Sequence, residues 1–119
     1  MATHNDYGYW GEDAAEQYLV NKGYTICHRD WRSGHRDIDI VAYDGSELVF
    51  VEVKTRRNCV FCNPEEAVDE RKMQNLIIAA ENYVSTYKID RPTRFDIITV
   101  LGNKEQGYSI NHIKDAFLP

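Results

Sequence analysis

The chain has 119 residues, of which 43% are hydrophobic and 28% are charged, and its formal net charge is −5. This length suits a single domain, which we expect to span residues 1–119, and the composition excludes a disordered chain or a coiled coil. The negative net charge excludes a general nucleic-acid coat protein, although basic residues gathered at one place could still bind nucleic acid.

The first half of the chain predicts a helix followed by three strands. Helix-spaced apolar residues cover about 9–22 and stop at Gly23, a residue typical of helix ends. A short strand is expected at 24–27, followed by a basic and aromatic link at 29–36. Strands at 37–43 and 47–55 then flank Asp44-Gly45-Ser46, which indicates a hairpin.

The second half predicts one more helix and two more strands. Asn63-Pro64 and Glu66 are typical of a helix start, and the helix continues to Tyr87, with a break near Asp69. Strands are expected at 95–101 and 107–113. Because the helix connects two strands that can then run parallel, we expect an α/β fold with a mixed sheet of about five strands flanked by helices.

Charged residues interrupt the two hairpin strands, which otherwise look buried. In the strand at 47–55, Glu52 and Lys54 lie on a face that begins with apolar residues. In the strand at 37–43, strict alternation places Ile38 and Ile40 on one face and Asp39 on the other. A turn centred on residues 45–46 puts Asp39 opposite Glu52, whereas a turn centred on residues 44–45 makes them diagonal neighbours. In both cases the two carboxylates lie within about 5–8 Å of each other.

Such a carboxylate pair repels itself unless a cation or a proton relieves it. Mg²⁺ prefers carboxylates, water and phosphate oxygens as ligands, and Lys54 at the same edge could assist a water or neutralise charge on a reacting phosphate. A strand that turns polar residues to solvent would contain the same residue types without any metal. The Glu-x-Lys spacing alone is weak evidence, because Glu70-Arg71-Lys72 repeats it.

Basic residues flank these acids. Arg36 precedes the first hairpin strand, and Arg56 and Arg57 follow the second. Since the two strands are expected to be antiparallel, these arginines should converge at one edge of the sheet, which suits contact with a phosphodiester backbone. Ordinary solvated loop arginines are the alternative interpretation.

The same residues resemble the YraN-like family of small bacterial proteins. This family consists of predicted endonucleases of the PD-(D/E)XK, or restriction-endonuclease-like, superfamily and is related to archaeal Holliday junction resolvases. The similarity spans about residues 8–117 and includes Gly11-Glu12, Trp31-Arg32, Asp37-Ile38-Asp39, Val51-Glu52-Val53-Lys54, Pro64-Glu65-Glu66 and Arg94-Phe95-Asp96. The chain departs from the family pattern at Arg36-Asp37, where Gly-Glu is usual, and at Asp30, where asparagine is common.

The resemblance implies a restriction-endonuclease-like core and a metal-dependent endonuclease that acts on DNA, including branched DNA in repair or recombination. It implies that Asp39 and Glu52 bind Mg²⁺ or Mn²⁺, that Lys54 and Glu12 are also catalytic, and that Lys72 contacts phosphate. A non-catalytic DNA-binding or partner-recruiting module with the same fold, action on RNA, and a homodimer all stay open.

The helix pattern gives Glu12 two alternative roles. Its neighbours three and seven residues on are Ala15 and Leu19, so it lies beside the apolar stripe and needs a partner if it is buried. That partner is either an arginine or the amides of the helix N-terminus, or else Glu12 joins Asp39 and Glu52 directly or through a metal-bound water.

The cysteines point to no site of their own. Cys59 and Cys62 form a CxxC, but a zinc site lacks an evident set of four ligands and a redox pair would lie in the first turn of a helix, so two ordinary loop cysteines are the favoured interpretation. Three cysteines suit a reducing compartment. With no signal-like start and no long apolar stretch, we expect a cytoplasmic protein without membrane contact.

Overall fold

The computed structural model describes residues 4–57 and 69–117, with side chains from residue 9 onward. Its elements in chain order are α1 (His4–Asn21), β1 (Thr25–Ser33), β2 (Arg36–Asp44), β3 (Glu47–Arg56), α2 (Glu70–Tyr87), β4 (Thr93–Asn103) and β5 (Gly107–Ile113). Within the described residues, five strands form a sheet in the order β1-β2-β3-β4-β5, in which only β3 and β4 are parallel. The expected α/β fold with a mixed sheet is confirmed, and it is compatible with a restriction-endonuclease-like core.

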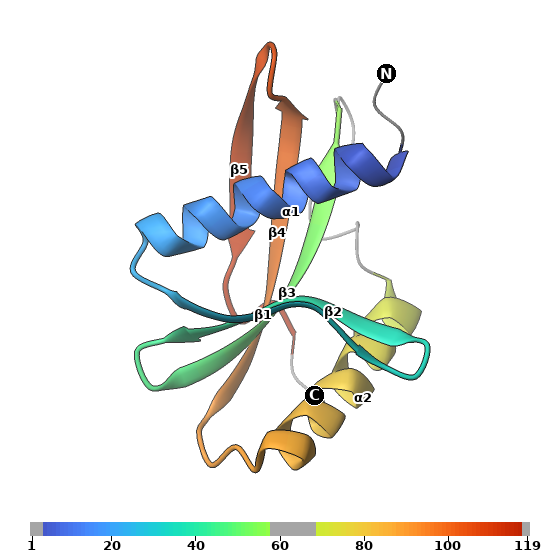
Figure 1. Ribbon diagram of the computed structural model, residues 1–119, viewed down its shortest axis with the longest axis vertical. Coiled ribbons are helices and arrows are strands. Elements are labelled where there is room, and N and C mark those ends of the chain that lie inside the picture. Colours follow the sequence, from blue (N-terminus) through green and yellow to red (C-terminus); the bar gives the residue numbers. More distant parts are fainter. Residues whose placement is uncertain (1–3, 58–68, 118–119) are drawn as a thin grey trace.

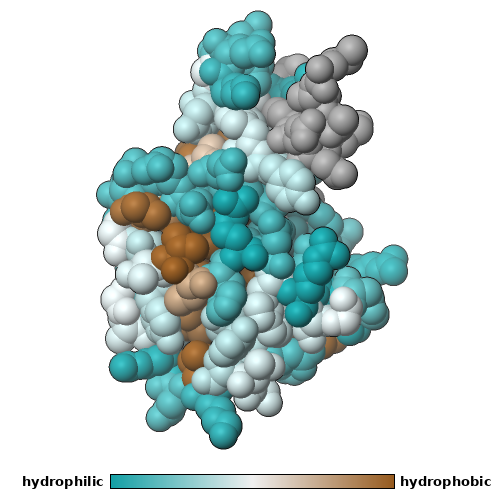
Figure 2. Space-filling view, viewed as in Figure 1, coloured by the Kyte–Doolittle hydropathy of each residue, from teal (hydrophilic) through white to brown (hydrophobic). Residues whose placement is uncertain are grey.

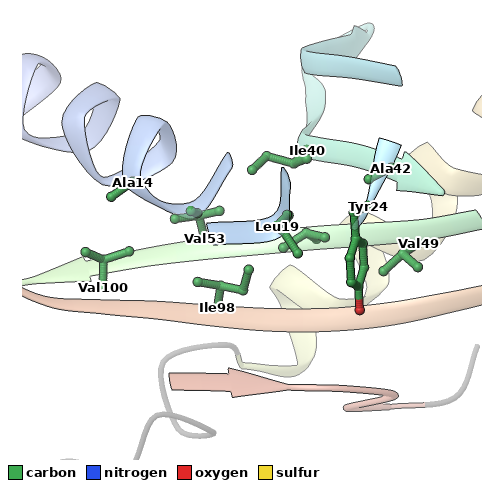
Figure 3. Close-up of a cluster of buried hydrophobic side chains, with 11 residues drawn as sticks. Ala14, Leu19, Tyr24, Ile40, Ala42, Val49, Val53, Ile98 and Val100 are labelled. Carbon is green, nitrogen blue, oxygen red and sulfur yellow. The ribbon is translucent and has the colours of Figure 1, made fainter. Parts of the chain in front are cut away.

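The helices pack on opposite faces of this sheet (Figure 1). On the α1 side, Leu19 packs against the alternating valines of β3 and against Ile98 of β4 (Figure 3). On the α2 side, Leu76 and Ala80 pack against Phe50 of β3 and other apolar residues. The predicted alternation of β3 is therefore confirmed, because its valines and its larger apolar residues belong to different cores.

The hairpin of β2 and β3 has the first of the two registers considered above. Pairs run from Asp44↔Glu47 to Ile40↔Val51, so Gly45 and Ser46 form the turn, and Gly45 has a φ of 61°. The paired residues end at Ile40↔Val51. Beyond that point β3 and the β1–β2 hairpin run in different directions (Figure 1). We call the place where they separate, next to residues 37–39 of β2 and 52–54 of β3, the fork.

Two expectations about the first half of the sheet are wrong. The segment predicted as a link at 29–36 is strand as far as Ser33, because β1 pairs with β2 up to Ser33↔Arg36. Its polar residues are tolerated because β1 is an edge strand that is only partly covered. Ile38 belongs to the core on the α2 side whereas Ile40 faces α1, so alternation breaks at Asp39 between them.

The remaining boundaries differ by a few residues. α1 begins at His4, before the predicted residue 9. α2 begins at Glu70 after the N-cap Asp69, whose side chain accepts a hydrogen bond from the Lys72 N–H, which accords with the predicted break there. The helix start predicted at Asn63-Pro64 and the CxxC lie outside the described residues.

The surface in Figure 2 is mostly hydrophilic, with a narrow hydrophobic band running downward from the carboxyl end of α1. Val20, near that end of α1, is exposed. Among the described helices, none is long and apolar enough to cross a membrane.

Candidate metal and active site

Asp39 lies at the fork and caps the backbone of β3. Its Oδ2 accepts a hydrogen bond of 2.8 Å from the Val53 N–H, a donor just beyond the last residue pair of the two strands. Burial and the negative charge of Glu52 raise the pKa of Asp39 well above its ordinary value, although the hydrogen bond from Val53 acts in the opposite direction. The fork thus holds a carboxylate in surroundings that disfavour its charge.

Asp30 and Glu12 approach Asp39 from β1 and α1. Asp30 lies between the pairs Arg29↔Ile40 and Trp31↔Ile38, which places it opposite Asp39, and its φ of 49° is in the left-handed region that aspartate tolerates. One carboxylate oxygen from each of Glu12, Asp30 and Asp39 lies within 4.8 Å of the others. We call these three residues the carboxylate trio.

Glu12 reaches the trio because α1 packs very closely on β3. A Cβ added to Gly11 would lie 2.0 Å from the Thr55 Oγ1, so only glycine allows this approach. Gly11 therefore permits the close contact between α1 and β3, and this contact brings the neighbouring Glu12 to the trio.

The charge on Glu12 is only partly compensated. The Arg29 guanidinium lies 3.5 Å from the Glu12 Oε1 but donates its hydrogen bond of 2.8 Å to Asp13, and the Oε1 is buried with no hydrogen-bond partner among the described residues. Burial, together with a hydrogen bond and charge repulsion from Asp30, raises the pKa of Glu12 to about 8 despite Arg29. Glu12 thus has the arginine partner considered above and also lies beside Asp39, while its role toward a metal stays a prediction.

Glu52 has a different environment on the α2 side of the fork. Its Oε1 lies 3.4 Å from the Lys54 Nζ and 3.7 Å from the Lys72 Nζ of α2. Burial raises the pKa of Glu52 and Asp37 raises it further, while Lys72 lowers it. Lys54 is 9% exposed, so an ammonium group is held in the interior beside this carboxylate. Glu52 therefore has two cations near it, in contrast to Asp30 and Asp39.

The structure separates the basic residues that were expected to converge. Arg36 lies next to the turn of the β1–β2 hairpin and donates a hydrogen bond of 3.2 Å to the Asn75 Oδ1 of α2. Arg56 and Arg57 are exposed at the end of β3, which leads away from that turn (Figure 1). The expected convergence is wrong because it assumed that β2 and β3 stay paired along their whole length. Contact of these arginines with nucleic acid stays a prediction.

Sequence reasoning missed Asp30 and Arg29 as members of this site. Both were placed in a link because their segment is polar, and polar edge strands are hard to recognise from periodicity. Extending the first strand to Trp31 and pairing it with the next would have placed Asp30 opposite Asp39.

A second polar cluster lies on the same sheet, beside the turn of the β2–β3 hairpin. Arg94 donates two hydrogen bonds, of 2.8 and 3.0 Å, to the fully buried Asp96. His112 lies 2.6 Å from the other side of Asp96, and the Asp115 N–H also donates to it. We call Arg94 and its partners the arginine network, which comprises Arg94, Asp96, His112, Tyr18, Tyr24, Asp44, Glu47 and the Asp115 N–H.

The protein is thus a small α/β domain, compatible with a restriction-endonuclease-like core, in which carboxylates gather where two neighbouring strands separate. The family described as "Uncharacterised protein family UPF0102" matches residues 11–100, and the chain belongs to this family. The expected relation to the YraN-like family is thereby confirmed.

Bacterial relatives match along almost the whole chain. A UPF0102 protein of Bacteroides thetaiotaomicron is 53% identical over 119 residues, which are 100% of this chain and 98% of the relative. One of Phocaeicola vulgatus is 46% identical over the same shares. One of Flavobacterium psychrophilum is 41% identical over 117 residues, 98% of each chain.

Proposed function

We propose that this protein is a Mg²⁺- or Mn²⁺-dependent endonuclease that hydrolyses phosphodiester bonds in DNA. The observation that supports this most is the grouping of Asp39, Glu52 and the buried Lys54 at the fork, with Glu12 reaching the same place from α1. Carboxylates that share a site and disfavour one another's charge are common at functional sites. The proposal extends the family relation, which by itself carries no activity.

The residues at the fork suit a hard divalent cation. The buried Glu12 Oε1 without a hydrogen-bond partner offers a free acceptor, and carboxylate oxygens are the ligands that Mg²⁺ and Mn²⁺ prefer. Asp39, Glu52 and Glu12 would hold the ion. When bound, it would stabilise negative charge on the scissile phosphate and lower the pKa of a water molecule.

The lysines of the site would act on the same phosphate. Lys54 is fixed within 3.4 Å of Glu52, so its ammonium group would stay beside the reaction centre and neutralise charge that develops on the phosphate oxygens. Lys72 keeps a more exposed side chain, 47% accessible, and would bind a phosphate at the entrance. The protein would thus position the substrate through one fixed and one exposed cation.

A cleavage panel tests the proposal. Linear, nicked, flapped, single-stranded and four-way DNA, with a matched RNA, would be incubated with and without Mn²⁺, and the resemblance to resolvases makes four-way DNA the first substrate to examine. We expect metal-dependent cleavage by the wild type and at least a hundredfold loss in Lys54→Met. Lys104→Met, which removes an exposed cation on the turn between β4 and β5, is the matched control and should cleave normally.

The outcomes separate the rival functions. DNA binding without cleavage under any condition would reject the nuclease and leave a DNA-binding module. Cleavage that survives in Lys54→Met would reject the fork as the active site. Cleavage of the RNA in preference to every DNA would reject DNA as the substrate.

The basic residues predicted to contact DNA give a second, independent measurement. If Arg36, Arg56, Arg57 and Lys72 contact phosphates, replacing all four by alanine should flatten the salt dependence of DNA binding by about 0.7–0.9 in slope for each lost contact. A variant with four exposed cations replaced elsewhere, Arg71, Lys88, Arg91 and Lys104, is the control. An equal slope in both variants would place the DNA on another surface.

A further inference from the structure

We infer that Asp30 is a direct ligand of the divalent ion, so that the ion binds within the carboxylate trio of Glu12, Asp30 and Asp39 while Glu52 flanks it. This inference rests on the proposed function, because it concerns the metal proposed there. It adds a ligand from β1, the edge strand, and moves the centre of the site from the Asp39–Glu52 pair toward α1.

The distances favour the trio. One oxygen from each of its three residues lies within 4.8 Å of the others, and Glu52 is not a member of that group. Octahedral ligands at about 2.1 Å from Mg²⁺ lie about 3 Å apart when adjacent and about 4 Å apart when opposite. A small inward movement of side chains would therefore bring all three oxygens onto one ion, without a change in the backbone.

The charges favour the trio as well. Glu52 has Lys54 and Lys72 within ion-pair distance, whereas among the described residues no lysine or arginine forms an ion pair with Asp30 or Asp39. Arg29 lies 3.5 Å from the Glu12 Oε1, but its 2.8 Å hydrogen bond goes to Asp13, outside the trio. Of the three acids, only Glu12 has an ion-pair partner among the described residues, so a divalent cation would gain most at this place.

A second observation, a buried oxygen atom without a hydrogen bond, also points to the trio. The Glu12 Oε1 is buried and has no hydrogen-bond partner among the described residues. Glu12 is the member of the trio that lies on α1. A buried acceptor without a donor is destabilising. The Arg29 guanidinium lies 3.5 Å from this oxygen but forms no hydrogen bond with it, so an ion bound in the trio would supply the missing partner.

Isothermal titration calorimetry with Mn²⁺ tests the inference without any need for activity. We expect Asp30→Asn to weaken Mn²⁺ binding at least tenfold, because a neutral amide replaces a charged ligand. Asparagine keeps the left-handed conformation of residue 30, so the fold should persist. Asp30→Gly, which the same φ also allows, removes the ligand altogether and should weaken binding further.

Asp37→Asn is the matched control. Asp37 is an exposed residue of β2 whose charge acts on both Asp39 and Glu52, but it is not part of the trio. It therefore measures the effect of removing one nearby negative charge without removing a ligand. We expect less than a threefold change in Mn²⁺ affinity for this variant.

Two further variants separate this inference from the proposed function. If Asp39→Asn and Glu52→Gln abolish Mn²⁺ binding while Asp30→Asn behaves like Asp37→Asn, Asp30 is no ligand and the metal-dependent nuclease stands. If the wild type binds no Mn²⁺, both fail. If Asp30→Asn loses at least tenfold with an unchanged melting temperature while Asp37→Asn does not, Asp30 is confirmed as a ligand.

Discussion

The fork and the arginine network each place an aspartate inside the same sheet, but with opposite surroundings. Asp96 accepts hydrogen bonds from Arg94 and the Asp115 N–H and lies 2.6 Å from His112. Burial alone would raise the pKa of Asp96, but these partners outweigh it and hold that pKa below its ordinary value. Asp39 accepts a hydrogen bond from the Val53 N–H, but burial and the negative charge of Glu52 outweigh it and raise the pKa of Asp39.

This difference is the one expected between a structural role and the functional role that we propose for the fork. A buried carboxylate surrounded by donors contributes to folding, and the arginine network ties β4 to the hairpin turn, to α1 and to β5. A buried carboxylate beside other carboxylates does not favour folding, so it points to a ligand that compensates the charge. The charge balance thus favours the fork over the arginine network as the place of the proposed function.

The largest effect should come from the centre of the arginine network. Arg94→Ala leaves Asp96 buried with its main partner gone, and breaking a buried ion pair on one side costs about 3–5 kcal/mol in the free energy of unfolding. Urea denaturation measures this. Arg91→Ala, an exposed arginine three residues earlier, should change stability by less than about 0.5 kcal/mol. A similar change in the free energy of unfolding in both variants would contradict a structural role of the network.

Replacing each of the two aspartates by asparagine should change the free energy of unfolding in opposite directions. In buffer with a chelator at pH 8, Asp96→Asn should lower the free energy of unfolding by about 2–3 kcal/mol, because it loses charge-assisted hydrogen bonds. Asp39→Asn should raise it by about 1 kcal/mol, because it removes repulsion from Glu52 while its amide oxygen still accepts from Val53. A loss of stability in Asp39→Asn would contradict the comparison.

The pH dependence of the two changes in the free energy of unfolding, in Asp39→Asn and in Asp96→Asn, gives a sharper test. The pKa of Asp96 is lowered on folding, so its stabilisation is complete above the unfolded-state pKa of about 3.9 and is lost as the pH falls through the folded-state value. The pKa of Asp39 is raised, so its penalty is absent below about pH 3.9 and grows as the pH rises toward the folded-state value. The gain from Asp39→Asn should therefore shrink on acidification well before the loss from Asp96→Asn does.

Much of the fold could be predicted because its elements follow simple periodicities. The alternating valines of β3, the Gly45-Ser46 turn and the amphipathic pattern that ends at Tyr87 each gave an element close to the observed one. β1 could not be predicted to its full length, because its second half is polar and its order depends on pairing with β2. Such pairing is a tertiary effect that local patterns do not contain.

The candidate site could be predicted in part for the same reason. Asp39, Glu52 and Lys54 belong to neighbouring strands whose register follows from one turn, so their proximity could be expected. The separation of Arg36 from Arg56 could not, because the fork arises where pairing stops at Ile40↔Val51. Asp30 was missed because its role depends on the unpredicted part of β1.

The smallest effect concerns the contact that brings Glu12 to the fork. In an exposed helix interior, Gly→Ala stabilises by about 0.5–1 kcal/mol. At Gly11 we expect the opposite, a loss of about 1–2 kcal/mol and a several-fold weaker affinity for Mn²⁺, because the new Cβ would lie 2.0 Å from the Thr55 Oγ1 and α1 must move away, taking Glu12 with it.

The double variant Gly11→Ala/Thr55→Ala distinguishes this displacement from a general helix defect. Thr55→Ala removes the two nearest atoms, Oγ1 at 2.0 Å and Cγ2 at 2.9 Å, and leaves only the Cβ at 3.0 Å. Stability and Mn²⁺ affinity should both recover toward those of Thr55→Ala alone, which is the reference for this pair. If Mn²⁺ binding is unchanged in Gly11→Ala while stability falls, then the close packing of α1 serves the core and Glu12 lies outside the metal site.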